Sequence, residues 1–313
     1  MPDTVIRTEN LTRDFGSLRA VNGLSIEVPA GTIFGFLGPN GSGKTTTIRM
    51  LLGLLEPTAG RAEVLGFDVR TQSDQIRLRA GALLEHHGLY ERFSAWDNLE
   101  FYGRIWRLPR ARRHARIEEL LRGLGLWERR QEAVKGWSRG MKQKLGVARA
   151  LLHRPSVVFL DEPTAGLDPV AAAALREDLA RLAAQEGVTV FLTTHNLVEA
   201  EKLCHSVAVI STGRLLAAGH PDQLRSRAGS RAEIRARGLS AQLVEVLQGR
   251  PDVLAVEAED TRLTMELHPG ADLAPLVALL VGAGVQIEEV RKASLEDVFR
   301  TLIEEDQKCS PTC

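Results

Sequence analysis

Eight residues, GPNGSGKT at positions 38–45, constrain this chain more than any other part of its sequence. They match the pattern G-x-x-x-x-G-K-[ST], a glycine-rich loop that joins a strand to a helix and wraps nucleotide phosphates. The required neighbours are present, because the apolar run TIFGFLG leads into the loop and the periodic run KTTTIRMLLGLL follows it. A chance glycine turn would not supply both, so we predict a nucleotide-binding protein.

The residue types in this loop suit phosphate binding. Gly38, Gly41 and Gly43 allow the backbone to turn its N–H groups toward phosphate oxygens. Lys44 supplies a positive charge for the β- and γ-phosphates, and the Thr45 hydroxyl can ligate Mg²⁺. We expect nucleotide contacts along the whole stretch: Gly38, Pro39, Asn40, Gly41, Ser42, Gly43, Lys44, Thr45 and Thr46.

Two neighbouring acids, Asp161 and Glu162, follow the apolar run VVFL at 157–160. The carboxyl end of such a strand is where open α/β sheets bind ligands. Asp161 suits Mg²⁺ coordination, directly or through water, and Glu162 is placed to orient the attacking water. A single acid here could simply cap the next helix, but two in tandem beside a phosphate loop favour catalysis.

Two further residues are candidates for nucleotide contacts because of their positions in the sequence. His195 ends the strand VFLTTH, which we expect in the same sheet as the phosphate loop, so its ring can reach the γ-phosphate. A lone histidine at a strand end is more often structural. Phe15 offers a ring that can stack on adenine, although a phenylalanine near a strand end is usually a core residue.

A second possible phosphate site begins at WSRGMKQ, residues 137–143. Ser138, Arg139 and Gly140 precede a long amphipathic pattern and mark the start of a helix. Free N–H groups at a helix start bind anions. The chain therefore carries two phosphate-binding devices, about a hundred residues apart, which one bound nucleotide does not explain.

The pattern along the chain predicts two domains, as its length of 313 residues suggests. The first, residues 1–226, is an α/β nucleotide-binding core: a mostly parallel sheet, an antiparallel β subdomain near the start, and an inserted helical subdomain at about 90–154. The second, residues 229–305, has the order βαββαβ plus a helix, typical of a small ferredoxin-like α+β module. Ser294 and Asp297 predict a capping box at that final helix, and residues 306–313 a disordered tail.

Composition excludes several classes. Forty basic residues balance forty acidic ones, so no overall charge favours nucleic acid. The three cysteines do not suggest a disulfide framework and fit a reducing cytosol. The start of the chain lacks the apolar core of a signal peptide, and no apolar run reaches the about 20 residues that a membrane span needs.

Residues 4–224 carry GPNGSGKT, WSRGMKQ, FLDEPTAGLD and TTH in this order, and so resemble the ATP-binding subunit of an ABC transporter. The resemblance implies that two subunits pair head to tail and that each ATP lies between the phosphate loop of one and the signature helix of the other. Ser138, Arg139, Gly140 and Met141 would then act on the partner's ATP, which explains the second phosphate device. It further implies Asp161 as the magnesium acid, Glu162 as the catalytic residue that polarises the hydrolytic water, His195 as the switch histidine, Asp168 in the dimer-interface loop and Phe15 as the adenine-stacking ring.

The chain departs from the family pattern at named positions. Glu85 stands where glutamine is usual, so its share in holding Mg²⁺ is open, and Trp137, Arg139 and Met141 replace commoner signature residues. These variants and the C-terminal SLEDVFRTL resemble the daunorubicin-resistance (ABC-2) type of multidrug and antibiotic exporter. That branch implies a separate multi-span permease, which would hold the subunit at the cytoplasmic face of the membrane.

Two other classes are weighed against this one. A non-transport ABC-type ATPase acting on ribosomes or DNA would usually carry two ATPase halves or a long coiled coil, and this chain has one phosphate loop and no sustained heptads. A GTPase or metabolite kinase would share the loop but leave the signature helix unexplained, and no N-K-x-D guanine-reading stretch is present.

Overall fold

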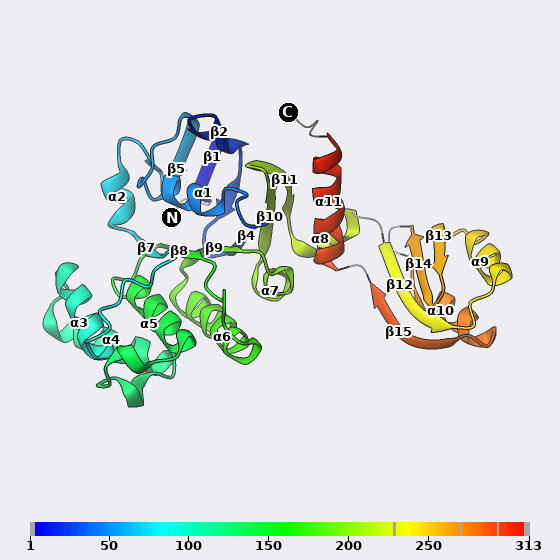
Figure 1. Cartoon of the computed structure of the whole chain (residues 1–313). Coiled ribbons are helices and arrows are strands. Elements are labelled where there is room, and N and C mark those ends of the chain that lie inside the picture. The colour runs from blue at the N-terminus through cyan, green and yellow to red at the C-terminus, as the bar shows by residue number, and fades with distance from the viewer. Residues whose placement is uncertain (1–3, 228–229, 269–270, 293, 310–313) are drawn as a thin grey trace. The chain divides into compact units, whose positions relative to one another are not determined.

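The computed structural model describes residues 4–227, 230–268, 271–292 and 294–309, and the chain divides into two compact units, Met1–Ala218 and Gly219–Cys313 (Figure 1). This division lies a few residues before the predicted boundary at 226–229. The difference is helix α8 (Pro221–Arg227), which contacts α11 (Leu295–Cys309) and so groups with the second unit.

A six-stranded sheet with the order β11-β10-β4-β9-β8-β7 forms the centre of the first unit. Neighbouring strands from β10 to β7 run parallel. All residues of β4, β8 and β9 are buried, as expected for a parallel sheet covered on both faces. The strands are β4 (Ile33–Leu37), β7 (Ala80–Leu83), β8 (Val157–Asp161), β9 (Thr189–Thr194), β10 (Ser206–Ser211) and β11 (Arg214–Gly219).

An antiparallel sheet is built around β1 (Thr4–Phe15), as predicted for the start of the chain. β1 pairs with β2 (Leu18–Leu24), β3 (Glu27–Pro29) and β5 (Ala59–Val64), and β5 pairs with β6 (Phe67–Asp68). Its buried side chains belong to the same core cluster as those of β4, β8, β9 and helix α1 (Lys44–Leu51). The two sheets are therefore joined by one hydrophobic core.

The segment predicted to be helical contains α3 (Ala95–Ile105), α4 (Arg110–Gly123) and α5 (Arg139–Leu151), which contact one another (Figure 1). Short 3₁₀ turns at Trp127–Arg129 and Val134–Gly136 lead into α5. Helices α2 (Ser73–Arg77), α6 (Pro169–Glu186) and α7 (Leu197–Leu203) complete the first unit. Across the residues that the structure describes, every helix is too short or too polar to span a lipid bilayer.

The second unit has the predicted ferredoxin-like order: β12 (Ser230–Arg237), α9 (Ala241–Gln248), β13 (Val253–Glu259), β14 (Arg262–Leu267), α10 (Ala274–Gly282) and β15 (Gln286–Lys292). Its sheet has the order β13-β14-β12-β15, and all neighbours are antiparallel. Each βαβ unit is therefore split by one strand, which is the ferredoxin-like topology. A separate core of aliphatic side chains from the sheet, α9 and α10 stabilises this unit.

Both ends of the last helix, α11, bear on predictions made from the sequence. The Ser294 N–H donates to the Asp297 carboxylate at 2.9 Å and the Asp297 N–H to the Ser294 hydroxyl at 3.4 Å, so the predicted capping box is present. Helix α11 continues to Cys309, which corrects the prediction of a disordered tail for residues 306–309. Residues 310–313 of that predicted tail lie outside the described residues.

A buried ion pair joins α3 to α4. Glu100 accepts hydrogen bonds from Arg113 Nε at 2.6 Å and Nη2 at 2.7 Å, and the two side chains are only 13% and 9% exposed. These hydrogen bonds are the main reason why the pKa of Glu100 falls from 4.5 to about 2. A bidentate pair of this kind is among the stronger polar contacts in proteins.

We predict that Glu100→Gln lowers the free energy of unfolding by about 1–2 kcal/mol at pH 7, allowing for solvent screening of the pair. Because the folded state lowers the pKa of Glu100, its stabilisation is complete above pH 4.5 and is lost as the pH falls toward 2. Urea unfolding of wild type and variant across this range measures the effect. Glu118→Gln, which breaks the exposed pair with Arg122, is the control and should cost under about 0.5 kcal/mol; equal losses would contradict the prediction.

Candidate nucleotide site

A cavity of about 550 Å³ lies at the carboxyl edge of the central sheet, where the phosphate loop and the end of β8 meet. Segments far apart in the sequence line it, because parallel strands end on the same side. The predicted residues among its lining are Phe15, Asn40, Gly41, Gly43, Lys44, Thr45, Thr46, Glu85, Arg139, Asp161 and Glu162.

The glycines of the loop are required by its backbone. Gly41 and Gly43 have φ values of +81° and +101°, in the left-handed region that side chains disfavour. A Cβ at Gly43 would lie 2.4 Å from the Ala20 carbonyl oxygen, and one at Gly38 would lie 2.5 Å from the Ile210 carbonyl oxygen. The loop is thus packed from behind against β2 and β10, which holds its N–H groups in place.

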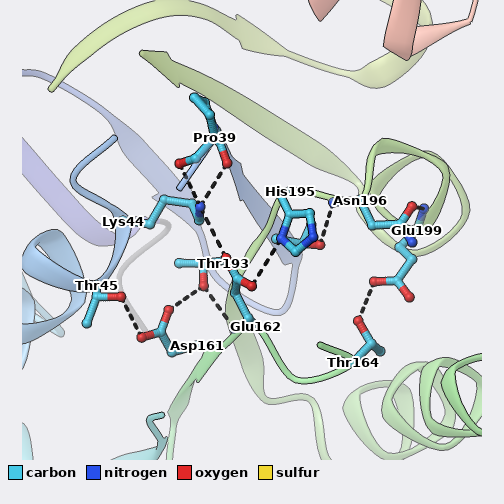
Figure 2. A network of polar contacts seen from close by, with 12 residues as sticks. Pro39, Lys44, Thr45, Asp161, Glu162, Thr164, Thr193, His195, Asn196 and Glu199 are labelled. Atoms are coloured by element: carbon cyan, nitrogen blue, oxygen red, sulfur yellow. Dashed lines mark hydrogen bonds and ion pairs between the residues drawn. The ribbon is translucent and has the colours of Figure 1, made fainter. Parts of the chain in front are cut away.

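Lys44 is buried in the loop, with only 5% of its side chain exposed. Its Nζ donates to the carbonyl oxygens of Gly38 at 2.8 Å and Pro39 at 3.0 Å, and lies 3.2 Å from Glu162 Oε1 (Figure 2). An ammonium group has three N–H donors, so all of them are engaged. The carboxylate is the one contact of the three that does not belong to the loop backbone.

One hydroxyl, that of Thr193, organises both acids (Figure 2). It donates to Asp161 Oδ1 at 2.6 Å and accepts from the Glu162 N–H at 3.0 Å, and Thr193 is completely buried. Asp161 Oδ2 also accepts from the Thr45 hydroxyl at 2.8 Å. The sequence analysis missed Thr193, although its position directly after the apolar run VFL at 190–192 was an available signal.

Glu162 lies in a strained conformation between two cationic or potentially cationic groups. Its φ of +48° is rare for a residue with a side chain and is typical of functional sites. Its Oε1 faces Lys44, and its Oε2 lies 3.0 Å from His195 Nδ1. Because an ionised carboxylate only accepts hydrogen bonds, this contact places a proton on Nδ1 of His195. The other ring nitrogen, Nε2, does not take part in the contact.

His195 lines a neighbouring cavity of about 340 Å³ and not the main one. Glu162 lines both cavities and so connects them. The second cavity also contains Asn196, which caps α7 by accepting from the Glu199 N–H, and Glu199, which accepts from Thr164 and pairs with Arg176 at 2.8 Å. The predicted histidine is therefore beside the acid rather than within the phosphate cradle.

Of the four signature residues 138–141, one lines the main cavity and three do not. Ser138 caps α5 by accepting from the Met141 N–H at 3.3 Å, and Ser138, Gly140 and Met141 do not line either cavity. Arg139 lines the main cavity of its own chain, and its guanidinium fills the space that a Cβ on Gly166 would need. Asp168 caps α6, accepting from the N–H groups of Val170 and Ala171 at 3.0 and 2.9 Å.

Phe15, Glu85 and His87 also line the main cavity. Phe15 is 45% exposed, and the guanidinium of Arg13 lies 4.6 Å from its ring centroid. Burial lowers the pKa of His87 and nearby cations including Arg139 lower it further, while a hydrogen bond with Gln143 acts in the opposite direction. The sequence analysis did not assign a role to His87 or to Gln143, which also lines the cavity and ends the stretch WSRGMKQ.

The donors around Thr45 and Asp161 fit Mg²⁺. In the described part of the chain, no group of three or more His, Cys, Asp or Glu side chains is arranged to hold a metal. Mg²⁺ commonly takes one or two protein oxygens and completes its shell with phosphates and water. A hydroxyl and a carboxylate oxygen 2.8 Å apart, beside the phosphate loop, match that requirement.

Comparison with known proteins agrees with this geometry. Residues 21–165 match the family model described as ABC transporter. The chain is 37% identical to the daunorubicin resistance ATP-binding protein DrrA3 of Streptomyces coeruleorubidus over 98% of both proteins. It is also 37% identical to the bacitracin transport ATP-binding protein BcrA of Bacillus licheniformis, over 96% of this chain and 97% of that protein.

This chain belongs to the ATP-binding subunits of ABC transporters. A solved ATP-binding subunit of an ABC transporter superposes with a TM-score of 0.64 and 30% identity, over 72% of this chain and 93% of that one. The predicted family and the predicted ATPase activity are thereby confirmed. The relatives match almost the whole chain, so the second unit is part of the similarity as well.

For this ATP-binding subunit we predict that Gly43→Ala destabilises the first unit more than Gly41→Ala does. Both substitutions place a side chain at positive φ, which costs about 1–2 kcal/mol. At Gly43 the new Cβ would also collide with the Ala20 carbonyl, whereas nothing lies within 4 Å of a Cβ at Gly41. Urea unfolding without nucleotide should show an additional loss of at least about 1 kcal/mol for Gly43→Ala; equal stability of the two variants would count against the backbone argument.

Proposed function

We propose that this ATPase works as a head-to-tail homodimer that drives a separate membrane permease, which exports drugs, antibiotics or other small molecules from the cytoplasmic side. The main support is the continuous network from Lys44 through Glu162 to His195, with Asp161 and Thr45 joined to it by Thr193. The similarity to subunits for daunorubicin resistance and bacitracin transport supports the export role.

Within the proposal, ATP binding changes the partners of Lys44. All three of its donors are engaged, so phosphate oxygens have to replace one contact, and the Glu162 carboxylate is the replaceable one. Once released, Glu162 keeps its contact with His195 and can accept the proton of the attacking water. His195 then acts as a positioning residue for the base and as a contact for the γ-phosphate.

Mg²⁺ would be held by Thr45 and Asp161, and when bound it neutralises charge on the β- and γ-phosphates. Thr193 fixes the Asp161 carboxylate through a buried hydrogen bond, so the acid presents its other oxygen toward Thr45. Glu85 lies in the same cavity, and its carboxylate is a further candidate for the outer metal shell.

The partner subunit supplies what the cavity lacks. Ser138, Gly140 and Met141 lie at the N-terminus of the 13-residue helix α5 but outside their own cavity. The positive end of this helix and the Ser138 hydroxyl are therefore available to the γ-phosphate of a second copy. Asp168 follows Glu162 on the loop that would cross between the subunits, and Phe15, which lines the main cavity, would stack on adenine.

The helical segment offers a docking surface for the permease. Tyr90, Phe93 and Ile105 are 46%, 42% and 57% exposed, and the Tyr90 ring contacts those of Phe93, Phe101 and Tyr102. A cluster of partly exposed aromatic side chains is typical of a protein interface. We propose that short helices of the permease dock here.

The ribosome- or DNA-associated alternative is the weaker one, because the described relatives serve resistance and transport. Sedimentation of cell extracts separates the two proposals. A transport subunit should be found with the membranes when its permease is present, whereas co-sedimentation with ribosomes and absence from the membranes would favour the alternative.

We predict that Glu162→Gln reduces ATP turnover by at least about a hundredfold, because the base is removed, while ATP still binds. The variant should accumulate as a dimer when ATP and Mg²⁺ are added, as size-exclusion chromatography would show. Lys44→Ala is the contrasting variant and should weaken ATP binding itself. Normal hydrolysis by Glu162→Gln would refute the assigned role.

We also predict that two inactive variants restore activity when they are mixed. Ser138→Asp keeps a good helix cap but places negative charge where the partner's phosphate would bind, so it should fold normally and not hydrolyse ATP. In a head-to-tail dimer of Ser138→Asp and Lys44→Ala subunits, one of the two sites contains only wild-type residues. ATPase assays of each variant and of the mixture test this; if the mixture stays inactive although mixed dimers form, the head-to-tail arrangement is wrong.

A further inference from the structure

The second unit contains a charged cavity of about 220 Å³ that the proposed ATPase mechanism does not use. It lies over the middle of the four-stranded sheet, on the face opposite the aliphatic core, and Arg300 of α11 also lines it. Four guanidinium groups and two carboxylates line it, so cations exceed anions by two: Glu233, Arg235, Arg262, Glu289, Arg291 and Arg300.

The strand register places two of these cations side by side. Arg235 on β12 lies directly opposite Arg262 on β14. Like charges directly opposite each other on antiparallel strands are destabilising, and an ordinary exposed sheet face alternates its charges. The other edge of β12 does alternate, since Glu233 faces Arg291 and Arg235 faces Glu289. The pairing of Arg235 with Arg262 is therefore the exception that needs a compensating anion.

The carboxylates of the cavity do not supply that compensation fully. Glu233 accepts from Arg262 and lies 3.4 Å from Arg291, which also donates to Asp297 at 3.0 Å. On the other neighbouring strand of β14, which is β13, Glu259 lies opposite Arg262. Arg235 faces Glu289 on β15 and has no hydrogen bond or ion pair among the residues that the structure describes, whereas the charge of Arg300 contributes to lowering the pKa of Asp297. Arg235 therefore lines the cavity with N–H donors that have no partner among the described residues.

The shape and chemistry of the cavity indicate its ligand. Guanidinium forks bind the oxygen atoms of phosphate in pairs, more strongly than they bind neutral groups. Since water occupies about 30 Å³ per molecule, the cavity has room for about seven waters or one small anion. We propose that this cavity binds a phosphate group through Arg235, Arg262 and Arg300, carried either by a small soluble molecule or by a membrane lipid.

The proposal can be tested on the full chain with ADP and Mg²⁺ in saturating amounts, so that the nucleotide site is occupied. Pyrophosphate is the soluble probe, and hydrogen–deuterium exchange of the segments 232–237 and 262–267 is the readout. Vesicles of phosphatidylcholine, with and without phosphatidylglycerol, are the lipid probe. We expect protection of both segments by pyrophosphate, or by the phosphatidylglycerol vesicles alone if the phosphate belongs to a lipid.

Two variants separate this site from general charge effects. Arg235→Gln removes a guanidinium group from the cavity. It should raise the probe concentration needed for half-maximal protection about tenfold, which is the usual effect of losing one hydrogen bond to a charged group. Arg237→Gln removes the same charge from the same strand, but Arg237 pairs with Glu288 and does not line the cavity, so its effect should stay within about twofold. Absence of protection with both probes, or an equal loss in the two variants, would overturn the proposal.

Discussion

The parallel pairing of β4, β8 and β9 is the constraint on which the first unit depends. Each of these strands is fully buried and contains an apolar run, so the charged groups that nucleotide chemistry needs lie where the strands end. The phosphate loop follows β4, Asp161 ends β8, and His195 follows β9. The same strand arrangement therefore buries the apolar side chains of the sheet and brings the site residues together.

At that edge, buried hydrogen bonds restrict the charged groups to a few positions. The Thr193 hydroxyl contacts both acids, and the strained backbone of Glu162 directs its carboxylate between Lys44 and His195. A phosphate that draws Lys44 away alters the surroundings of Glu162 directly. Such a coupling gives a physical reason why nucleotide binding and the readiness of the proposed base would change together.

The second unit follows a different plan. Its aliphatic core lies on one face of the sheet, and the opposite face carries charged side chains in which Arg235 and Arg262 meet. Four arginines around a small cavity are compatible with stable folding because the carboxylates of Glu233 and Asp297 offset part of the charge. All residues that line this cavity belong to the second unit.

The sequence by itself determined the family, the phosphate loop, the paired acids and the ferredoxin-like order, since these depend on local patterns of glycine, charge and apolar spacing. It did not reveal that Thr193 connects the two acids, that α8 groups with the second unit, or that α11 extends to Cys309. Only tertiary structure decided that Arg139 lines its own cavity while Ser138 and Gly140 do not, and that Arg235 lies opposite Arg262. The reason is that strand register and the packing of distant segments, rather than any local pattern, decide which side chains meet.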